Sequence, residues 1–507
     1  MVPACTRHAR TGRVPTPRTR AVPSPDTPRL HGVCAKLCRM GPLRRALVPA
    51  AIACTAWTAP AAALAPPPLR DGHGLTVAGV EQRSPRLFAV TLTTPELTAP
   101  TRVWILLPDG YDANPRKRYP VLYLFHGTSG GAADWVQQGD AEATTAGRDL
   151  ITVMPDAGVD GDGGGYFADW VNGGKGGPPR WETHHVRDLI PWVDANLRTR
   201  AARSGRAIAG LSQGGYGAFS YAARHPDRFA AAAAFSAPLD SSADPEAAGV
   251  FTAVVTVTET TLNGDPPGTI FGDRAADGIN WAAHDPATLA ANLRGMRLFV
   301  LSGDGRPGPF DTAPNPAGTA IEAGAFRLTE LFIARLRAAS IPVEYHPYGP
   351  GTHTWPYWAR DLRDVIGPLT DELAHPRPAP ARIDYTSDAA TFTQWGWRVA
   401  MRRDVRELAS LQDAGRRGFT LAGSGTGVVR TPKRYRRRQA VVVRLKGPAV
   451  DARRRLRAGP GGRLTVEVPL GPSNTRQQFT AGAQTTVRST VVTLRPVTPA
   501  TPRKRRR

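Results

Sequence analysis

The sequence predicts an α/β protein in which a mostly parallel sheet is flanked by helices, followed by a smaller all-β region. Two observations in the middle of the chain predict the sheet. Apolar runs of strand length alternate with segments of helical periodicity, and several of these runs are apolar throughout, as in strands covered on both faces. A third observation predicts the all-β region, because past residue 385 the helical patterns stop and short alternating or β-branched runs recur between Gly/Pro turns.

The charge of the chain is distributed unevenly. The 507 residues carry a net charge of +23, made up of +9 in residues 1–65, −8 in residues 66–375 and +22 in residues 376–507. A chain of this length has room for two or three domains, each with its own core. The overall basic character therefore says little about the mildly acidic middle, where we expect the chemistry to lie.

All four cysteines, Cys5, Cys34, Cys38 and Cys54, fall in the first 54 residues. A disulfide framework or a cysteine metal site is therefore excluded from the remaining chain. Cys34 and Cys38 have the spacing of half a zinc site, but no second pair of ligands follows at a suitable spacing, so we expect no metal there. Cys54 is a weak candidate for lipid attachment.

Residues 1–65 are interpreted as an N-terminal extension and a secretory signal peptide. Met40 opens a basic stretch, residues 46–57 form a short apolar run, and small residues at 63–65 offer a cleavage site. The apolar run is too short to span a bilayer comfortably. We expect translation to start at Met40 and the mature protein to be secreted or associated with the cell envelope.

The expected elements of the middle segment follow from the length and periodicity of its apolar runs. Residues 87–92 and 102–107 alternate, which is typical of edge or antiparallel strands. Continuous runs predict buried strands at 121–125, 150–154, 207–211, 229–235, 298–301 and 343–348. Helical spacing predicts helices at 181–197, 215–224 and 325–339. Active-site loops of such a sheet belong at the carboxyl ends of its strands.

The strongest motif is Gly-Leu-Ser-Gln-Gly at 210–214, between the strand at 207–211 and the helix at 215–224. In a G-x-S-x-G sequence the serine stands on a sharp strand-to-helix turn, so its neighbours must be small. The turn holds the Ser212 hydroxyl above the sheet, and the following helix points N–H groups at an oxyanion formed there. This pattern predicts that Ser212 is a nucleophile.

Two glycine-rich loops follow other strands. The loop His-Gly-Thr-Ser-Gly-Gly at 126–131 follows the strand at 121–125, and we expect the N–H groups of Thr128 and Gln213 to form an oxyanion hole. The alternative is an ordinary strand-to-helix turn. The aspartate-rich loop at 156–165 has Gly164 where a calcium loop needs a ligand, so we expect a flexible loop lining the site.

An acid and a histidine complete the pattern in the chain order nucleophile, acid, histidine. Asp304 directly follows the strand at 298–301 and is the first candidate for the acid, with Asp311 second. His353 lies on a tight turn after the strand at 343–348 and is the best placed of the eleven histidines. His184 and His185 are expected on a solvated helix face.

The chain between residues 100 and 372 resembles the antigen 85 mycolyltransferases and the secreted esterases grouped with them, in the esterase D type of α/β-hydrolase. The resemblance rests on five motifs in the family's order: Tyr-Phe-Ala-Asp-Trp at 166–170, Arg-Trp-Glu-Thr at 180–183 with Ile-Pro-Trp at 190–192, Gly-Leu-Ser-Gln-Gly-Gly at 210–215, Gly-Asp-Gly-Arg-Pro at 303–307 and Gly-Thr-His-Thr-Trp-Pro-Tyr-Trp at 351–358.

This resemblance implies an α/β-hydrolase fold and acyl transfer through a serine ester, with no metal or organic cofactor. It implies that the acid is Glu322, 31 residues before His353, with Asp304 as the rival. Where the mycolyltransferases have an arginine after the oxyanion residue, this chain has Ser129, which weakens the case for a mycolate or trehalose substrate. The substrate-lining candidates are the tryptophans of three of the motifs: Trp170, Trp181 and Trp355.

We place the catalytic domain at 66–373, a Pro-rich linker at 374–385, a basic β-rich domain at 386–496 and a disordered tail at 497–507. Basic runs at 433–438 and 453–457 give the β-rich domain a charged surface, unless they are merely solvated loops. We expect this domain to bind an anionic envelope polymer or a membrane surface, and not nucleic acid, since no recognition motif is present. A carbohydrate site at Trp395 and Trp397 is an alternative.

Three hypotheses about the function of the whole chain remain open. The first is a secreted serine esterase or acyltransferase, acting on a lipid or small acyl ester that could be a glycolipid, and the sequence does not choose between water and a sugar hydroxyl as acceptor. The second is a non-catalytic envelope-binding protein with a hydrolase-like fold. The third is a polyester or plant cell-wall esterase, such as a feruloyl esterase. Residues 240–295, the expected lid and substrate wall, carry no readable signature.

Overall fold

The computed structural model describes residues 66–158, 163–172, 174, 177, 179–242 and 244–497. The proposed signal peptide, its start at Met40 and cleavage at 63–65, and the four cysteines lie outside these residues. No helix of the described residues is long and apolar enough to cross a membrane.

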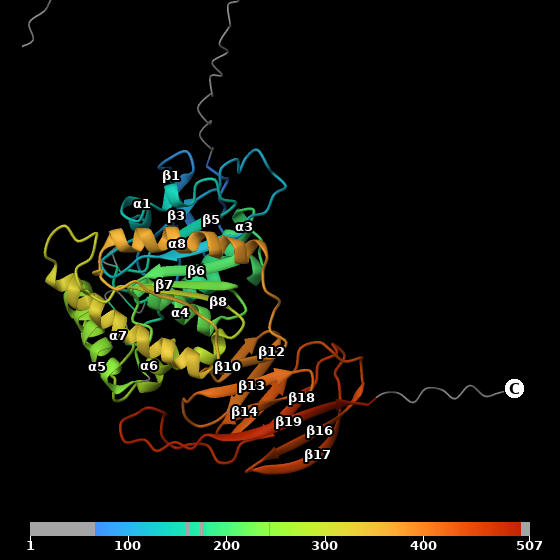
Figure 1. The fold of residues 1–507 in the computed structure, drawn as a ribbon. Coiled ribbons are helices and arrows are strands. Elements are labelled where there is room, and N and C mark those ends of the chain that lie inside the picture. Colours follow the sequence, from blue (N-terminus) through green and yellow to red (C-terminus); the bar gives the residue numbers. More distant parts are fainter. Residues whose placement is uncertain are drawn as a thin grey trace, which may run out of the picture. The chain divides into compact units, whose positions relative to one another are not determined.

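The described chain up to helix α8 (Trp355–Ala374) contains a nine-stranded sheet (Figure 1). Its strands are β1 (Thr76–Gln82), β2 (Leu87–Thr93), β3 (Thr101–Leu106), β4 (Val121–Phe125), β5 (Ile151–Pro155), β6 (Arg206–Leu211), β7 (Ala231–Phe235), β8 (Arg297–Ser302) and β9 (Glu344–Pro347). Their order across the sheet is β1-β2-β3-β5-β4-β6-β7-β8-β9. The strand pairs β1–β2, β2–β3 and β3–β5 are antiparallel. The remaining pairs, from β5–β4 across to β8–β9, are parallel. The sequence predicted all of these strands except β1.

The helices of this α/β part lie in the segments that connect or follow its strands. They are α1 (Asp134–Gln137), α2 (Ala141–Thr144), α3 (Ile190–Asn196), α4 (Gln213–Arg224), α5 (Pro245–Val257), α6 (Gly278–His284), α7 (Pro316–Ala338) and α8 (Trp355–Ala374). Shorter π and 3-10 turns are η2 (Thr183–Leu189), η3 (Arg203–Gly205), η4 (Thr258–Asn263) and η5 (Ala290–Leu293). The expected helix at 181–197 is thus a π turn followed by α3.

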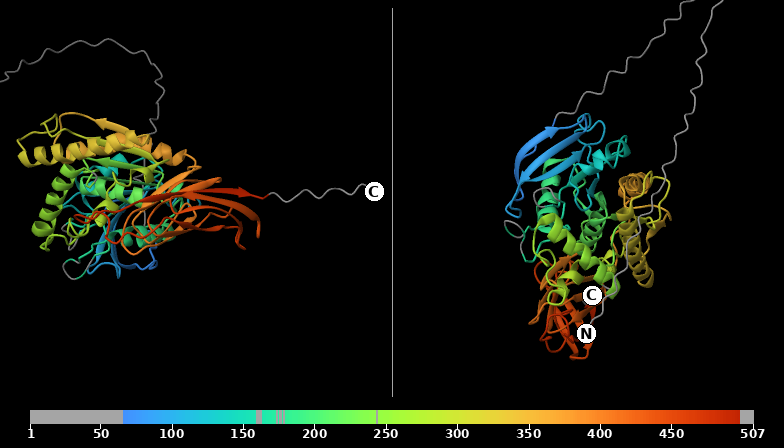
Figure 2. Two further views of the ribbon diagram at one scale, coloured as in Figure 1. Left: turned by 90° about the horizontal axis from the view of Figure 1, so that it is seen from below. Right: turned by 90° about the vertical axis from the view of Figure 1, so that its left-hand side faces the viewer.

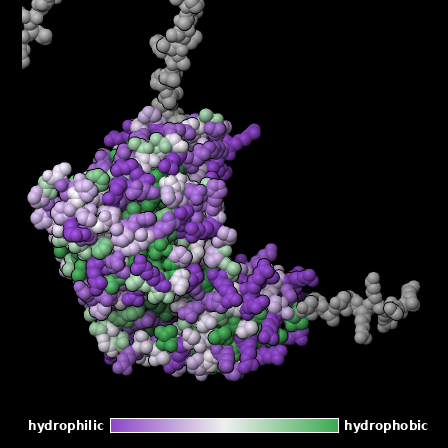
Figure 3. Space-filling model, viewed as in Figure 1, coloured by the Kyte–Doolittle hydropathy of each residue, from purple (hydrophilic) through white to green (hydrophobic). Residues whose placement is uncertain are grey.

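Alternate residues of the parallel strands pack into two cores on opposite faces of the sheet. Leu122 and Leu124 of β4 belong to the core that α8 covers, through side chains such as Leu362 and Leu369. Tyr123 and Phe125 belong to the other core, with Phe219 of α4 and residues of α7. Figures 1 and 2 show α8 along one side of the strands, and Trp135 of α1 and Ala141 of α2 pack into the same core. In the view of Figure 3, hydrophilic residues cover most of the surface and hydrophobic residues appear in smaller patches.

Residues 383–496 form an antiparallel sandwich. One sheet has the order β10-β13-β14-β19-β16-β17 and the other the order β11-β12-β15-β18. The strands are β10 (Ile383–Ser387), β11 (Thr391–Gln394), β12 (Trp397–Arg402), β13 (Ala409–Gly415), β14 (Gly418–Gly423), β15 (Thr426–Arg430), β16 (Ala440–Gly447), β17 (Val450–Arg457), β18 (Thr465–Pro469) and β19 (Arg488–Pro496). Both sheets contribute to one shared core.

Strands β11 and β12 form a hairpin, in which Trp395 (φ 51°) and Gly396 (φ 79°) both adopt the left-handed conformation that a two-residue hairpin turn requires. Two expectations for the sandwich need correction. Trp397 is only 3% exposed in the sandwich core, so it is not part of a carbohydrate surface. The basic run at 453–457 is in strand β17 and not in a loop.

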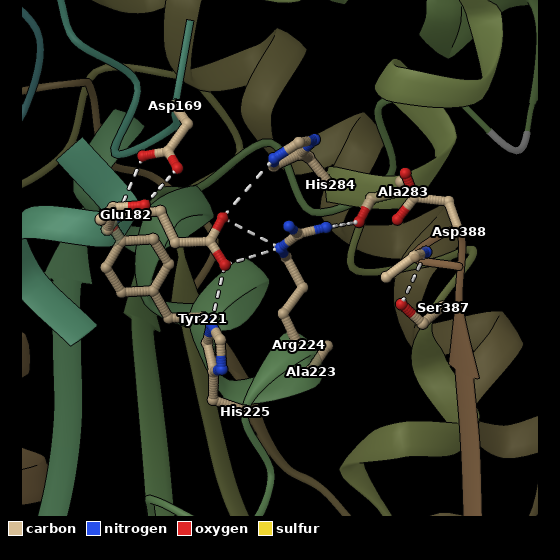
Figure 4. A network of polar contacts seen from close by, with 12 residues as sticks. Asp169, Glu182, Tyr221, Ala223, Arg224, His225, Ala283, His284, Ser387 and Asp388 are labelled. Atoms are coloured by element: carbon tan, nitrogen blue, oxygen red, sulfur yellow. Dashed lines mark hydrogen bonds and ion pairs between the residues drawn. The ribbon is translucent and has the colours of Figure 1, made fainter. Parts of the chain in front are cut away.

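A buried polar network joins the end of helix α4, which follows the G-x-S-x-G turn, to its surroundings (Figure 4). The carboxylate of Glu182 accepts hydrogen bonds from Arg224 Nε at 2.9 and 3.0 Å and lies 2.7 Å from His225 Nε2. His284 Nε2 lies 3.6 Å from the same carboxylate. Burial alone would raise the pKa of Glu182, but the charge of Arg224 and the two histidines hold it well below its usual range.

The sandwich contributes to the same helix end. The backbone carbonyl of Arg224 accepts hydrogen bonds from Tyr385 Oη at 2.8 Å and Gln394 Nε2 at 3.1 Å. Carbonyls at a helix C-terminus have no partner within the helix and must find one elsewhere. Strands β10 and β11 therefore cap α4, whose opposite end carries the G-x-S-x-G turn.

Replacing Glu182 with Gln should destabilise the fold strongly. The substitution removes the carboxylate that pairs with Arg224, whose side chain is 23% exposed, and breaking such a largely buried pair typically costs about 3 kcal/mol. We expect urea-induced unfolding to show this loss in the free energy of unfolding. The matched control is Glu246→Gln. The Glu246 side chain is 73% exposed, and its ion pair with Arg327 is long, at 3.9 Å, so its loss should cost little. Equal stability of both variants would contradict the role given to the network.

Candidate active site

Ser212 stands on the sharp turn between β6 and α4 that the G-x-S-x-G motif predicts. Its backbone adopts φ 51° and ψ −123°, a strained conformation for a residue with a Cβ. A Cβ added to Gly210 would lie 2.3 Å from the Gly214 carbonyl oxygen, and one added to Gly214 would lie 2.2 Å from the His126 carbonyl oxygen. Both glycines are therefore required by close backbone contacts, and the turn holds the hydroxyl at the carboxyl edge of the sheet.

The structure brings Ser212, His353 and Glu322 into one hydrogen-bonded chain. His353 Nε2 lies 2.9 Å from Ser212 Oγ, and His353 Nδ1 lies 2.6 Å from Glu322 Oε2. These residues are separated by up to 141 positions in the sequence and come from the turn before α4, the loop after β9 and the helix α7. Trp358 packs edge-on against the imidazole at 4.9 Å between ring centroids.

Glu322 is fully buried and held by three further donors. Its Oε1 accepts hydrogen bonds from Ser236 Oγ at 2.8 Å, Ser302 Oγ at 3.1 Å and the Gly303 N–H at 2.8 Å. Trp358 Nε1 donates to Ser236 Oγ at 3.0 Å, which fixes that hydroxyl in turn. Sequence reasoning missed Ser236 and Ser302. Each directly follows or ends a predicted strand, β7 and β8, and this position was the available signal.

The two aspartates considered as the acid have other partners. Asp304 forms an ion pair with Arg306 at 2.5 Å, and hydrogen bonding by Arg306 lowers the pKa of its carboxyl. Asp311 accepts hydrogen bonds from Tyr357 Oη at 2.6 Å and from the Thr352 hydroxyl. Asp311 therefore braces the turn that carries His353, and the carboxylate that meets the imidazole comes from Glu322.

Helix α7 begins earlier than the periodicity indicates. Asn315 caps it by accepting a hydrogen bond from the Gly318 N–H at 2.9 Å, and Pro316 occupies its first turn. Glu322 therefore lies inside the helix rather than ahead of it. The His353 N–H donates to the Gly318 carbonyl at 3.1 Å, which ties the histidine loop to the same helix.

Thr128 and Gln213, the expected oxyanion residues, line the same cavity as Ser212. Gln213 is the first residue of α4, where a backbone N–H has no partner within the helix. Its side chain donates to Thr128 Oγ1 at 2.8 Å and to the Gly163 carbonyl at 2.9 Å, and accepts from the Tyr166 N–H at 2.7 Å. The Gln213 side chain thus fixes the loop that carries Thr128, a role that the motif alone did not reveal.

The cavity beside Ser212 has a volume of about 880 Å³ and mainly apolar walls. Part of the wall comes from α5 and η4, within the segment 240–295 that was expected to form it. Trp355 lines this cavity, as does the exposed Ser129. Trp170 and Trp181 do not line it, because they are 4% and 3% exposed and pack in the core, which corrects their expected role.

His184 and His185 are buried and not on a solvated face, which is a second correction. His185 Nε2 lies 2.9 Å from the Asp156 carbonyl oxygen, and its Nδ1 lies 3.1 Å from Tyr221 Oη. Burial lowers the pKa of His184 to about 4 and that of His185 well below its usual range. These histidines are therefore neutral core residues. Of the aspartate-rich loop, residues 159–162 lie outside the described residues.

The arrangement has the parts needed for nucleophilic acyl chemistry. A serine hydroxyl that is hydrogen-bonded to an imidazole can be deprotonated as it attacks, and a buried carboxylate on the far nitrogen stabilises the imidazolium that results. In the part of the chain that the structure covers, no three His, Cys, Asp or Glu side chains are grouped as metal ligands would be.

The chain is similar in sequence to known esterases and acyltransferases. The profile of the Esterase family, described as putative esterases, matches residues 94–367. Esterase Rv1288 of Mycobacterium tuberculosis is 35% identical over 299 residues, which cover 56% of this chain and 59% of that protein. The diacylglycerol acyltransferase/mycolyltransferase Ag85A of Mycobacterium gordonae is 30% identical over 246 residues, covering 46% of this chain and 66% of that protein.

Solved structures with a similar chain path include Mycobacterium tuberculosis MPT51, with a TM-score of 0.46 and 24% identity over 58% of this chain and 99% of that one. A ferulic acid esterase matches with a TM-score of 0.40 and 24% identity, covering 56% of this chain and 98% of that one. The present chain spans 59% of the length of the esterase from M. tuberculosis, and the matched region ends before the sandwich.

Asp361 is a second buried carboxyl near Glu322, and its protonation should make the stability of the fold depend on pH. Burial raises the pKa of Asp361 to about 7, and the charge of Glu322 adds to this although Arg360 opposes it. A raised carboxyl pKa means that the folded state binds a proton that the unfolded state releases. Its stabilising effect is therefore complete below the unfolded pKa and is lost as pH rises through the folded pKa, between about pH 4 and pH 7.

Replacing Asp361 with Asn should remove this dependence. We expect the free energy of unfolding to fall less between about pH 5 and pH 8 in the variant than in the parent protein. Denaturant unfolding at the two pH values measures the difference. Asp364→Asn, on the same helix with a side chain 60% exposed, is the control and should keep the parent's dependence. An unchanged dependence in Asp361→Asn would show that Asp361 is not the group responsible.

Proposed function

Since the chain belongs to the family described as putative esterases, with antigen 85-type mycolyltransferases among its relatives, we propose that it is a serine esterase or acyltransferase acting on carboxylic esters. The observation that carries this proposal is the hydrogen-bonded chain from Ser212 through His353 to the buried Glu322. The family match, over residues 94–367, does not specify a substrate. The substrate is therefore argued from the cavity itself.

The proposed reaction has two halves. His353 Nε2 takes the proton of Ser212 as the hydroxyl oxygen attacks the ester carbonyl, and then gives that proton to the departing alcohol, which leaves an acyl-serine ester. An acceptor hydroxyl then loses its proton to His353 and attacks the acyl carbon, and the serine leaves with that proton. Glu322 holds the imidazole with Nε2 toward the serine and stabilises its charged form in both halves.

The backbone N–H groups of Thr128 and Gln213 are the proposed donors to the oxyanion in each tetrahedral intermediate. Support comes from the cavity that both residues share with Ser212 and from the position of Gln213 at a helix N-terminus. Donors that are fixed before the reaction stabilise charge without reorganising, and the loss of one typically costs about a hundredfold in rate.

The acyl group is the part of the substrate that the cavity fits best. Its walls include Val254 and Val257 of α5 and Leu328 of α7, which offer apolar contact to a hydrocarbon chain. Ser212, Gln213 and His353 line the same cavity, and the ester would lie beside them. Water as acceptor makes the enzyme an esterase and an alcohol makes it a transferase, and Ser129 in place of the family's arginine argues against a trehalose acceptor.

Hydrolysis of nitrophenyl esters of increasing acyl length by the purified protein tests the proposal. We expect Ser212→Ala to lower kcat by about ten-thousandfold, because the nucleophile is lost, and Glu322→Gln to lower it by about a hundredfold or more. Asp304→Ala is the matched acid control and should retain the parent rate, because its carboxylate pairs with Arg306.

Two outcomes would contradict the assignment. A parent protein without activity at every acyl length would favour the non-catalytic alternative. A severe loss in Asp304→Ala, together with an active Glu322→Gln, would move the acid to Asp304. Circular dichroism spectra of all variants establish that the fold is intact in each comparison.

The proposed place of action is outside the cytoplasm, at or beyond the cell envelope. The support is the basic start at Met40, the apolar run at 46–57 and the small residues at 63–65. The chain described from residue 66 onward contains no cysteine, so it meets an oxidising compartment without unpaired thiols.

Expression of the full chain in an actinobacterial host should release a shortened protein. We expect its N-terminal residue to lie between 64 and 66, because cleavage follows the small residues of the predicted site. Mass spectrometry of protein recovered from the medium and envelope measures this. A protein that stays in the cytosol with its N-terminal extension intact would contradict the proposed export.

A further inference from the structure

The outer face of the six-stranded sheet carries a two-dimensional array of cations. In β16, Val441, Val443 and Leu445 point into the sandwich core, so the alternate residues Arg444 and Lys446 point outward. Six exposed cations on β16, β17 and β19 share that outward side by register, and we call them the basic face: Arg444, Lys446, Arg453, Arg455, Arg457 and Arg495.

The register places like charges directly against each other. Arg444 lies opposite Arg453, and Val442 lies between Arg455 on one side and Arg495 on the other. Directly opposed like charges destabilise a sheet by themselves. The arrangement therefore works against the stability of the sandwich unless an anion from outside compensates for it.

Carboxylates on these strands compensate for little of this charge. Asp451 is the acidic residue of the three strands, and it pairs with Arg444 at 2.8 Å. Within the described residues no ion pair reaches Arg453, Arg455 or Arg495. Among the described residues Arg457 donates to the carbonyl of Arg438, at 3.4 Å, and pairs with no carboxylate.

We propose that the basic face binds a linear polyanion whose repeating groups are phosphodiesters without bases. Along β17 an arginine recurs at every second residue, about 7 Å apart, and neighbouring strands lie about 4.8 Å apart, so a chain of regularly spaced anions can follow the strand and contact several guanidinium groups. Five of the six cations are arginines, whose planar fork of donors matches phosphate oxygens.

The composition of the face argues against the two other polyanionic partners. β16, β17 and β19 contain no aromatic residue, so the face offers no surface on which nucleobases could stack. Val491, 50% exposed, is the large apolar side chain that these three strands expose. The strands also lack the aromatic anchors typical of a membrane interface, so a membrane is a poor partner for this face.

Binding at this face would leave the chemistry free to proceed. None of its six residues lines the cavity beside Ser212, so the polymer would hold the protein at a surface without entering that cavity. The inference concerns a site separate from the proposed esterase site, and it stands or falls without it.

Binding of the full chain to poly(glycerol phosphate) tests the proposal. The test variant replaces Arg453, Arg455 and Arg457 with Thr, which suits a strand. The control removes the same charge elsewhere, as Arg454→Thr on the opposite side of β17, with Arg116→Gln and Arg337→Gln at exposed positions. We expect the parent's affinity to fall steeply with salt, the test variant to bind about tenfold or more weakly, and the control to bind like the parent.

The test variant should unfold at the parent's temperature or higher, because it relieves like-charge contacts, so weaker binding cannot be ascribed to misfolding. Equal loss of binding in the test and control variants would overturn the proposal, since net charge and not the face would then be responsible. Tighter binding to single-stranded DNA or to phosphatidylglycerol vesicles than to poly(glycerol phosphate) would overturn the choice of partner. Ester hydrolysis measured alongside separates failure here from failure of the proposed activity.

Discussion

The hydrogen bond between the buried Glu322 and His353 is the contact on which the site depends. It ties α7 to the loop after β9 and turns the imidazole so that its other nitrogen faces Ser212. A fully buried carboxylate is costly unless it is well supplied with donors. Ser236, Ser302 and the N–H of Gly303 meet that need at the ends of β7 and β8. The sheet therefore positions the Glu322 carboxylate as directly as it positions the Ser212 hydroxyl.

The strained turn at Ser212 is held from both ends of α4. At its start, close backbone contacts leave no room for a Cβ at Gly210 or Gly214. At its far end, Arg224 is bound by Glu182, and its carbonyl is capped by Tyr385 from the sandwich. The C-terminal strands thus serve the α/β fold structurally, whatever they bind on their outer face, and the domain limits proposed from sequence remain a prediction.

Sequence reasoning predicted the parts of this molecule whose signals are local. The parallel strands have continuous apolar runs, and the turn at Ser212 and the loop at His353 have fixed motifs. The acid was a different case, because residue order favoured Asp304 and only family resemblance pointed to Glu322. Ser236 acts through distant contacts, and its place after a predicted strand was its only signal, so it was missed. His184 is buried by tertiary packing, for which the sequence has no local signal, so it was placed on the wrong face.

The proposed mechanism requires Ser212 to be an activated nucleophile, and covalent labelling tests this most directly. The purified protein would be treated with a fluorophosphonate probe, digested, and mapped by mass spectrometry. We expect one adduct on the peptide that contains Ser212, formed rapidly in the parent and at least about a hundredfold more slowly in His353→Ala. Absence of an adduct at Ser212 in the folded protein, or equal labelling in the His353 variant, would contradict the proposed mechanism.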